Sequence, residues 1–249
     1  KRIREDFLRI LRYVRFFLNY SKTKHQSNIK KIIRQNINGV AKLSKERLLT
    51  ELEKLLLSRG FINLSKDEFC KEIILLIFPQ LKNLNTFKHI NKYNKSLISK
   101  KDFIFLLSLL LIDETDNSDY FLYKFNLSNY AKNKINFLKK IYCKPIDKNT
   151  FSKKNLQKVL YYYGNSYLED MIDFKLFRSN KINTKLIELK EYFKKKERPL
   201  FPIKANIIME KYNIKEGKEL GDKLKNLENL WVENSFKIND KDVDNVFSN

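Results

Sequence analysis

Three side chains near the start of the chain, Glu5, Asp6 and Arg9, have types and a spacing that could do chemistry. Asp6 and Arg9 are three residues apart, so on a helix they face the same way. A carboxylate accepts hydrogen bonds and a guanidinium donates them, so together they could match the edge of a nucleobase. The alternative is an exposed intrahelical ion pair, which would stabilise the helix by only about 0.3–0.5 kcal/mol.

The segment around this pair has the apolar periodicity of a helix. Apolar side chains recur at steps of three and four, which predicts one helix from about Arg2 to Tyr20. Arg12 and Arg15 lie on the same segment. Because each step of three residues falls about 60° short of a full turn, Arg15 should point nearly opposite Asp6.

The letters of this segment read Arg-Ile-x-Glu-Asp-x-Leu-Arg-Ile-Leu-Arg-x-x-Arg-Phe from Arg2 to Phe16. This pattern closely resembles the Glu-Asp-x-x-Arg motif of the bacterial tRNA nucleotidyltransferase and poly(A) polymerase family. In that family the motif lies on a neck helix and pairs with the base of the incoming ATP or CTP. The resemblance implies that Asp6 and Arg9 read the base, that Glu5 orients Arg9, and that Arg12 and Arg15 contact the nucleotide.

Three further segments resemble the same family in the same order. The first, residues 43–56, reads Leu-Ser-x-Glu-Arg and then Glu-Leu-x-Lys-Leu-Leu, with Ser44 as the expected helix N-cap and Gly60 as its end. The second, residues 120–129, resembles a body motif in which Ser128 or Asn129 caps the next helix, which Pro145 should break. The third, residues 201–231, resembles the tail motif but departs from it at Ala205-Asn206 and around Gly217.

The resemblance implies an all-α, elongated array with no substantial sheet. We expect a neck over residues 1–63 with the base-reading helix, a helical body over 64–150, and a basic helical tail over 151–249. The function implied is nucleotide selection and RNA binding in an enzyme that adds CCA to tRNA 3′ ends from CTP and ATP. The alternatives are a poly(A) polymerase of the same family and a non-catalytic helical RNA-binding protein.

The family's catalytic head, which holds Mg²⁺ through an Asp-x-Asp pair, is expected to be missing from this chain. The chain has no Arg-Arg dipeptide, and its Asp240-Lys241-Asp242 triplet lacks flanking strand residues. We therefore expect no catalytic residue and no metal ligand here, and an inactive fragment. The uncapped start at Ile3 suggests the same truncation.

Composition supports a helical protein with a polyanionic partner. The chain has 249 residues, 43% of them hydrophobic, but only 5 glycines and 4 prolines, fewer than the turns of a sheet protein require. The formal net charge of +22 attracts RNA or DNA, although an AT-rich genome would also raise the lysine content. We expect Lys194, Lys195, Lys196 and Arg198 to contact RNA phosphates; a solvated helix end is the alternative.

Other partner classes are not indicated by the sequence. The longest apolar run, Phe103 to Ile112, is too short to span a bilayer; because it is apolar nearly all round, we expect it at the centre of the body. No partner protein is evident. Cys70 and Cys143 lack a C-x-x-C spacing, which is typical of reduced cysteines and a cytoplasmic protein. His25 and His89 have no partner at ligand spacing, so no zinc site is expected. Tyr161-Tyr162-Tyr163, expected between two helices, could stack on bases or pack in the core.

Overall fold

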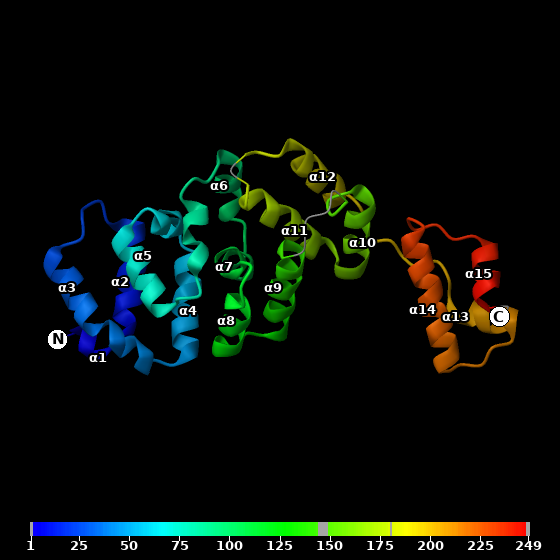
Figure 1. The fold of residues 1–249 in the computed structure, drawn as a ribbon, viewed down its shortest axis with the longest axis horizontal. Helices are drawn as coiled ribbons and strands as arrows, with labels where there is room; N and C mark the ends of the chain where they lie inside the picture. The colour runs from blue at the N-terminus through cyan, green and yellow to red at the C-terminus, as the bar shows by residue number, and fades with distance from the viewer. Residues whose placement is uncertain (1, 144–148, 180, 248–249) are drawn as a thin grey trace. The chain divides into compact units, whose positions relative to one another are not determined.

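A computed structural model describes residues 2–143, 149–179 and 181–247 of the chain (Figure 1). Within these ranges the secondary structure is helical and contains no strand, which confirms the predicted all-α class. Pro145 lies outside the described residues. The chain divides into two compact units, residues 1–147 with 170–187 and residues 148–169 with 188–249. The predicted boundary between neck and body, at residue 63, falls within the first unit and stays a prediction.

The first unit begins with short helices joined by tight 3-10 turns. In chain order these are α1 Arg2–Glu5, α2 Leu8–Tyr20, α3 Ser27–Asn36, η1 Ile37–Lys42, α4 Lys45–Leu56, η2 Arg59–Ser65, α5 Glu68–Ile77, η3 Lys82–Phe87, α6 Lys92–Ile98, α7 Phe103–Leu111, α8 Asn117–Phe125 and α9 Asn129–Tyr142. Ser44 accepts a hydrogen bond from Arg47 N at 3.4 Å, and Ser128 accepts one from Ala131 N at 3.3 Å. Both predicted N-caps are therefore confirmed.

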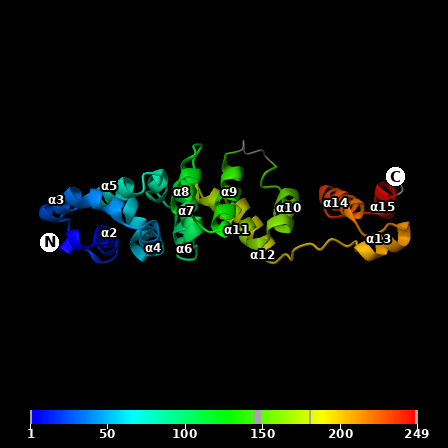
Figure 2. The same cartoon turned by 90° about the horizontal axis from the view of Figure 1, so that it is seen from below.

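The centre of this unit is α7, whose residues are apolar on nearly all sides. Phe105 to Ile112 are at most 1% exposed, and α7 contacts α4, α8 and α9 (Figures 1 and 2). A helix that is apolar all round has to be enclosed by other helices. The run that the sequence placed at the centre of the body lies there.

Gly60 has a different role from the predicted helix end. Helix α4 already stops at Leu56, and Gly60 is buried within η2. A Cβ at this position would lie 2.4 Å from the carbonyl oxygen of Leu18 on α2. Glycine is therefore required because two backbones meet here.

Four charged side chains form a buried network that joins the turn between α6 and α7 to α9 and α11 (Asn165–Phe177). Lys101 Nζ lies 2.8 Å from Asp170 and 2.5 Å from Asp173, and Lys134 Nζ lies 2.7 Å from Asp170. The pKa of each lysine is raised: burial opposes this, but the carboxylates outweigh it. Because a buried charge needs a partner, this network fixes α11 against the rest of the unit.

The second unit contains α10 Lys153–Tyr163, α13 Ala205–Tyr212, α14 Lys218–Glu233 and α15 Asp240–Phe247. Helices α11 and α12 (Thr184–Lys194) contribute residues to both units. Tyr161 packs against Trp231, with ring centroids 5.2 Å apart. Tyr161 to Tyr163 are the last residues of α10, so the expectation that they lie between two helices is wrong. Tyr161 is 9% exposed, so of the two alternatives, stacking on bases and packing in the core, this residue takes the second.

No helix within the described ranges is both long and apolar enough to cross a membrane.

Candidate functional site

The predicted helix over residues 2–20 is interrupted at the acidic residue of the motif. Helix α1 ends at Glu5 and α2 begins at Leu8, with Asp6 and Phe7 between them. Asp6 Oδ1 accepts a hydrogen bond from Leu8 N at 3.1 Å. Short acidic side chains compete in this way for backbone N–H groups and end helices. Asp6 is therefore held at the start of α2 rather than on a continuous helical face.

Two arginines approach the Asp6 carboxylate. Arg47 on α4 donates from Nη2 to Asp6 Oδ1 at 3.1 Å, while Arg12 Nη1 lies 3.9 Å from Oδ2, beyond hydrogen-bond distance. Partial burial works to raise the pKa of Asp6, but the Leu8 N–H and the two guanidiniums outweigh it and hold this pKa below its ordinary value. Asp6 is thus ionised at neutral pH. Its Oδ2 accepts no hydrogen bond from any described residue.

Arg12 and Arg15 meet a second carboxylate, that of Glu51. Arg15 Nε lies 2.6 Å from Glu51 Oε1, and Arg12 Nε lies 3.6 Å from Oε2. Glu51 is only 2% exposed, so these pairs fix α2 against α4. Arg15 is therefore directed toward α4, away from Asp6 as the helical spacing predicted. Its role as a nucleotide contact stays a prediction.

Arg9 and Glu5 are both exposed. Neither side chain forms a hydrogen bond or ion pair with any residue the structure describes, although the backbone N–H of Arg9 donates to Asp6 O at 3.1 Å. The orientation of Arg9 by Glu5 stays a prediction. The guanidinium of Arg9 keeps its donors available for a ligand. Together, Asp6 Oδ2 supplies an acceptor and Arg9 supplies donors within one turn of the chain.

The sequence analysis missed Arg47 and Glu51 as parts of this site. They lie four residues apart on α4, which places them on the same face of that helix. The signal was present, because both fall within the second segment that resembles the family. That segment was used only as a second sequence match to the family, and a sequence match does not show that α4 packs against α2.

The predicted RNA contacts lie at the end of α12 and just beyond it. Lys194 is the last residue of the helix, and Lys195, Lys196 and Arg198 follow it. Lys196 Nζ lies 3.2 Å from the hydroxyl of Tyr192 and 5.4 Å from the centroid of its ring. Cations at a helix C-terminus complement its dipole, so solvation and RNA binding both fit this arrangement.

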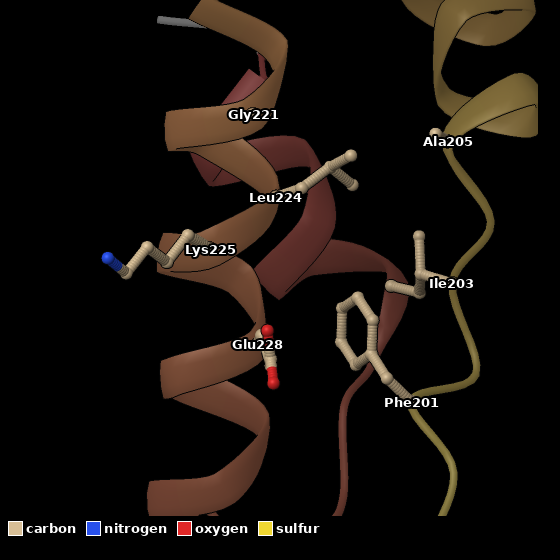
Figure 3. A pocket seen from close by; sticks show the side chains of 7 residues that line it. All are labelled: Phe201, Ile203, Ala205, Gly221, Leu224, Lys225 and Glu228. Carbon is tan, nitrogen blue, oxygen red and sulfur yellow. The ribbon is translucent and has the colours of Figure 1, made fainter. Parts of the chain in front are cut away.

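A hollow of about 490 Å³ lies between α14 and the segment that leads into α13 (Figure 3). Leu224 points from α14 toward Ile203 and Ala205, whereas Lys225 points away from them (Figure 3). The Glu228 carboxylate beside the hollow accepts a hydrogen bond from the Tyr161 hydroxyl. With apolar walls and its nearest carboxylate already paired, the hollow is part of the packing of this unit.

His25 is not isolated, contrary to the sequence analysis. It lies with Asp67 and Cys70, and their ligand atoms are within 4.8 Å of one another. Both cysteines are free, as predicted. A histidine, carboxylate and thiol do not suit Mg²⁺, which prefers oxygen ligands. Asp240 and Asp242 lie on α15, a helix rather than a strand. No step through Mg²⁺ follows from these residues.

The chain is similar over most of its length to enzymes that act on tRNA. It is 29% identical over 253 residues to "CCA tRNA nucleotidyltransferase 1, mitochondrial" of Mus musculus and 28% identical over 251 residues to the Homo sapiens protein of that name. Each alignment covers 96% of this chain and 54% of the relative, so the chain spans about half the length of these relatives. The Danio rerio protein of the same name is 44% identical over 57 residues, which cover 22% of this chain and 13% of the relative. No protein-family model matches the chain.

Proposed function

We propose that this chain is the nucleotide-selecting and tRNA-binding part of a CCA-adding tRNA nucleotidyltransferase. The observation that carries the proposal is the similarity to CCA tRNA nucleotidyltransferases over nearly the whole chain. The arrangement of Asp6 and Arg9 supports it independently, because the two side chains offer an acceptor and a donor to a planar ligand. The relatives are animal proteins, so they do not bear on the bacterial part of the resemblance.

Asp6 and Arg9 would select the base by complementary hydrogen bonding. Cytosine and adenine both present an exocyclic amino donor beside an unprotonated ring nitrogen, whereas guanine and uracil present a carbonyl beside a ring N–H. Asp6 Oδ2 would accept from the amino group, and Arg9 would donate to the ring nitrogen. With guanine or uracil, the Asp6 carboxylate would face the carbonyl oxygen of the base and the Arg9 donors would face its ring N–H. These unpaired groups would weaken binding of the wrong base.

Arg47 and Glu51 would position this pair and its neighbours. Arg47 occupies Asp6 Oδ1, which leaves Oδ2 for the base. Glu51 holds Arg12 and Arg15 against α4, so that Arg12 stays near Asp6. Charged groups that are paired before a ligand binds need less reorganisation when it arrives.

The basic surface would hold the RNA. A net charge of +22 favours phosphate, and double-stranded RNA is recognised mainly by its shape and backbone. Lys194, Lys195, Lys196 and Arg198 are the contacts we propose in the second unit. We also propose that this chain alone adds no nucleotide, that Mg²⁺ is held by residues outside it, and that the protein works in a reducing compartment such as the cytoplasm.

The proposal is tested by measuring how binding of this chain to RNA depends on salt. A folded tRNA and an unstructured RNA of the same length are compared from about 50 to 200 mM salt, the range over which phosphate contacts weaken strongly. We expect tighter binding to tRNA throughout and a steep fall with salt. If the two RNAs bound with equal affinity and equal dependence on salt, the net positive charge would attract any RNA alike, and the proposed specific binding of tRNA would be overturned.

Nucleotide addition separates CCA addition from the poly(A) alternative. The full-length protein is incubated with tRNA lacking its 3′ end and with all four nucleotides, and the products are sequenced. Addition of CCA supports the proposal, whereas a run of adenosines indicates the poly(A) polymerase. Incorporation of labelled nucleotide by this chain alone would contradict the proposed division of labour.

A further inference from the structure

Three side chains with metal-binding atoms converge at the edge of the first unit. His25 Nε2 lies 2.9 and 3.0 Å from the two Asp67 oxygens, and Cys70 Sγ lies 3.7 Å from His25 Nε2. Asp67 and Cys70 are 42 and 45 residues from His25 in sequence. None of the hydrogen bonds that join these three side chains involves Asp6, Arg9 or Glu51, and the proposed function makes no use of the cluster.

The fold places Asp67 and Cys70 on one face of α5. Asp67 is the N-cap of this helix, and its Oδ1 accepts a hydrogen bond from Cys70 N at 2.8 Å. An N-cap residue and the residue three positions later lie on the same side of the first turn. The thiol and the carboxylate are therefore held side by side by the start of the helix.

The imidazole of His25 is oriented from the other side by α2. Its ring stacks on that of Phe17, with centroids 3.5 Å apart, and Tyr13 Oη lies 2.7 Å from Nδ1. These contacts direct Nε2 toward Asp67 and Cys70. A hydrogen-bond partner on the second ring nitrogen is the usual companion of a metal-binding histidine.

The separations of these atoms suit a tetrahedral transition-metal ion. With Zn–N, Zn–O and Zn–S bonds of about 2.0, 2.1 and 2.3 Å, a tetrahedral ion separates nitrogen from sulfur by about 3.5 Å and nitrogen from oxygen by about 3.4 Å. The observed 3.7 Å between Cys70 Sγ and His25 Nε2 is within about 0.2 Å of the first value. The 2.9 Å between His25 Nε2 and Asp67 Oδ2 requires an opening of about 0.5 Å, within reach of an aspartate side chain that is 23% exposed.

We propose that His25 Nε2, one carboxylate oxygen of Asp67 and Cys70 Sγ bind a divalent transition-metal ion of the zinc and cobalt class, with water as the fourth ligand. A nitrogen, oxygen and sulfur donor set selects this class over Mg²⁺ and Ca²⁺. The thiolate and carboxylate carry two negative charges, which balance the charge of the ion. The ion would join the loop after α2 to the start of α5.

Binding would rearrange two protons. The ion replaces the thiol proton of Cys70, so one proton is released to water for each ion bound. The proton of the neutral imidazole then resides on Nδ1, where it is donated to the oxygen of Tyr13.

Cobalt spectroscopy on the whole chain tests the site, because Co²⁺ bound to a thiolate gives a charge-transfer band in the near ultraviolet. We expect the band to saturate at one Co²⁺ per chain and to be removed by excess Zn²⁺. The Cys70→Ser variant should lose it, whereas Cys143→Ser, which changes the other free cysteine, should keep it. No band in the wild-type chain, or a band that survives Cys70→Ser, would overturn the proposal.

Two conservative variants guard against loss of folding. Asp67→Asn keeps an oxygen that can cap α5 but removes the charge, and Tyr13→Phe removes only the partner of His25 Nδ1. Far-ultraviolet circular dichroism shows whether each stays helical. We expect Tyr13→Phe to weaken Co²⁺ binding by about 10- to 100-fold and Asp67→Asn to weaken it at least as much. Unchanged Co²⁺ affinity in both folded variants would show that neither the charge of Asp67 nor the partner of His25 contributes to binding, and would overturn the proposed site.

Discussion

Arg47 Nη2 and Asp6 Oδ1 lie 3.1 Å apart and join the start of α2 to α4. This contact occupies one carboxylate oxygen of Asp6 and leaves the other open. It also contributes to holding the pKa of Asp6 below its ordinary value, along with the Leu8 N–H and Arg12. The pair therefore sets both the charge and the orientation of the residue proposed to read the base.

Replacing Arg47 should change the titration of Asp6. In Arg47→Ala the pKa of the Asp6 carboxyl should rise toward its ordinary value, because one of its two guanidinium neighbours is gone. The carboxyl carbon shift of Asp6, followed by NMR against pH, measures this directly. Arg34→Ala is the matched control, since Arg34 pairs with Glu72 at 2.6 Å instead. An Asp6 titration that is the same in both variants would show that Arg47 does not act on Asp6 in solution.

Glu51 should matter more for stability than other paired glutamates. Glu51→Ala removes the buried carboxylate that pairs with Arg12 and Arg15, which we expect to lower the free energy of unfolding by about 1.5–3 kcal/mol, since the two arginines left behind are 44% and 21% exposed. Glu72→Ala is the control, because its partner Arg34 is 53% exposed and such pairs contribute about 0–1 kcal/mol. Urea unfolding followed by circular dichroism compares them. Similar losses in the two variants would contradict the assignment of Glu51 as the anchor of α2 on α4.

Gly60 and Gly221 should respond to alanine in opposite directions. At Gly60 the added Cβ meets the Leu18 carbonyl, so we expect a loss of about 1–3 kcal/mol. At Gly221, inside α14, nothing lies within 4 Å of the added Cβ, so alanine should stabilise by about 0.5–1 kcal/mol. Thermal unfolding of both variants gives the two signs. A stable Gly60→Ala protein would mean that α2 and η2 do not approach as closely as described.

Asp113 should contribute to the acid sensitivity of the first unit. Burial works to raise its pKa, but hydrogen bonds from the Thr115 hydroxyl and N–H and from Asn117 outweigh it, so its pKa is lowered on folding. A carboxyl with a lowered pKa stabilises the fold above its unfolded value of about 3.9, and this contribution disappears as the pH falls through the folded value.

The test of Asp113 compares urea midpoints at about pH 6 and pH 3, on either side of the unfolded carboxyl pKa. Asp113→Asn should lose less stability on acidification than the wild-type chain, because it no longer has this carboxyl to protonate. Asp116 accepts no side-chain hydrogen bond from a described residue, so Asp116→Asn should lose as much stability between about pH 6 and pH 3 as the wild type does. An Asp113→Asn protein as acid-sensitive as the wild type would refute the assignment.

The helices were predictable where local chemistry decides them. The run from Phe103 to Ile112 predicted the enclosed α7, and Ser44 and Ser128 predicted the starts of α4 and α9. These signals are contained in a few neighbouring residues. The periodicity of residues 3–18 nevertheless hid the interruption at Asp6, because a side chain that bonds its own backbone leaves the apolar pattern unchanged.

The parts of the site that escaped prediction depend on distant residues. Glu51 is 36 residues from Arg15, and Asp67 is 42 residues from His25. Local spacing contains no information about such contacts, which form only when α2 packs against its neighbours. The same limit explains why His25 was treated as isolated and why Gly60 was assigned to the end of a helix.

The most direct test of base reading is to sequence the 3′ ends that the full-length protein adds to tRNA. Arg9→Ala should reduce discrimination of cytosine and adenine against guanine and uracil by about 1–3 kcal/mol, while tRNA affinity stays unchanged. Arg59→Ala, which removes an exposed arginine in η2, should leave the added sequence intact. Unchanged selection in Arg9→Ala, or an equal loss for all four nucleotides, would contradict a base-reading role for Asp6 and Arg9.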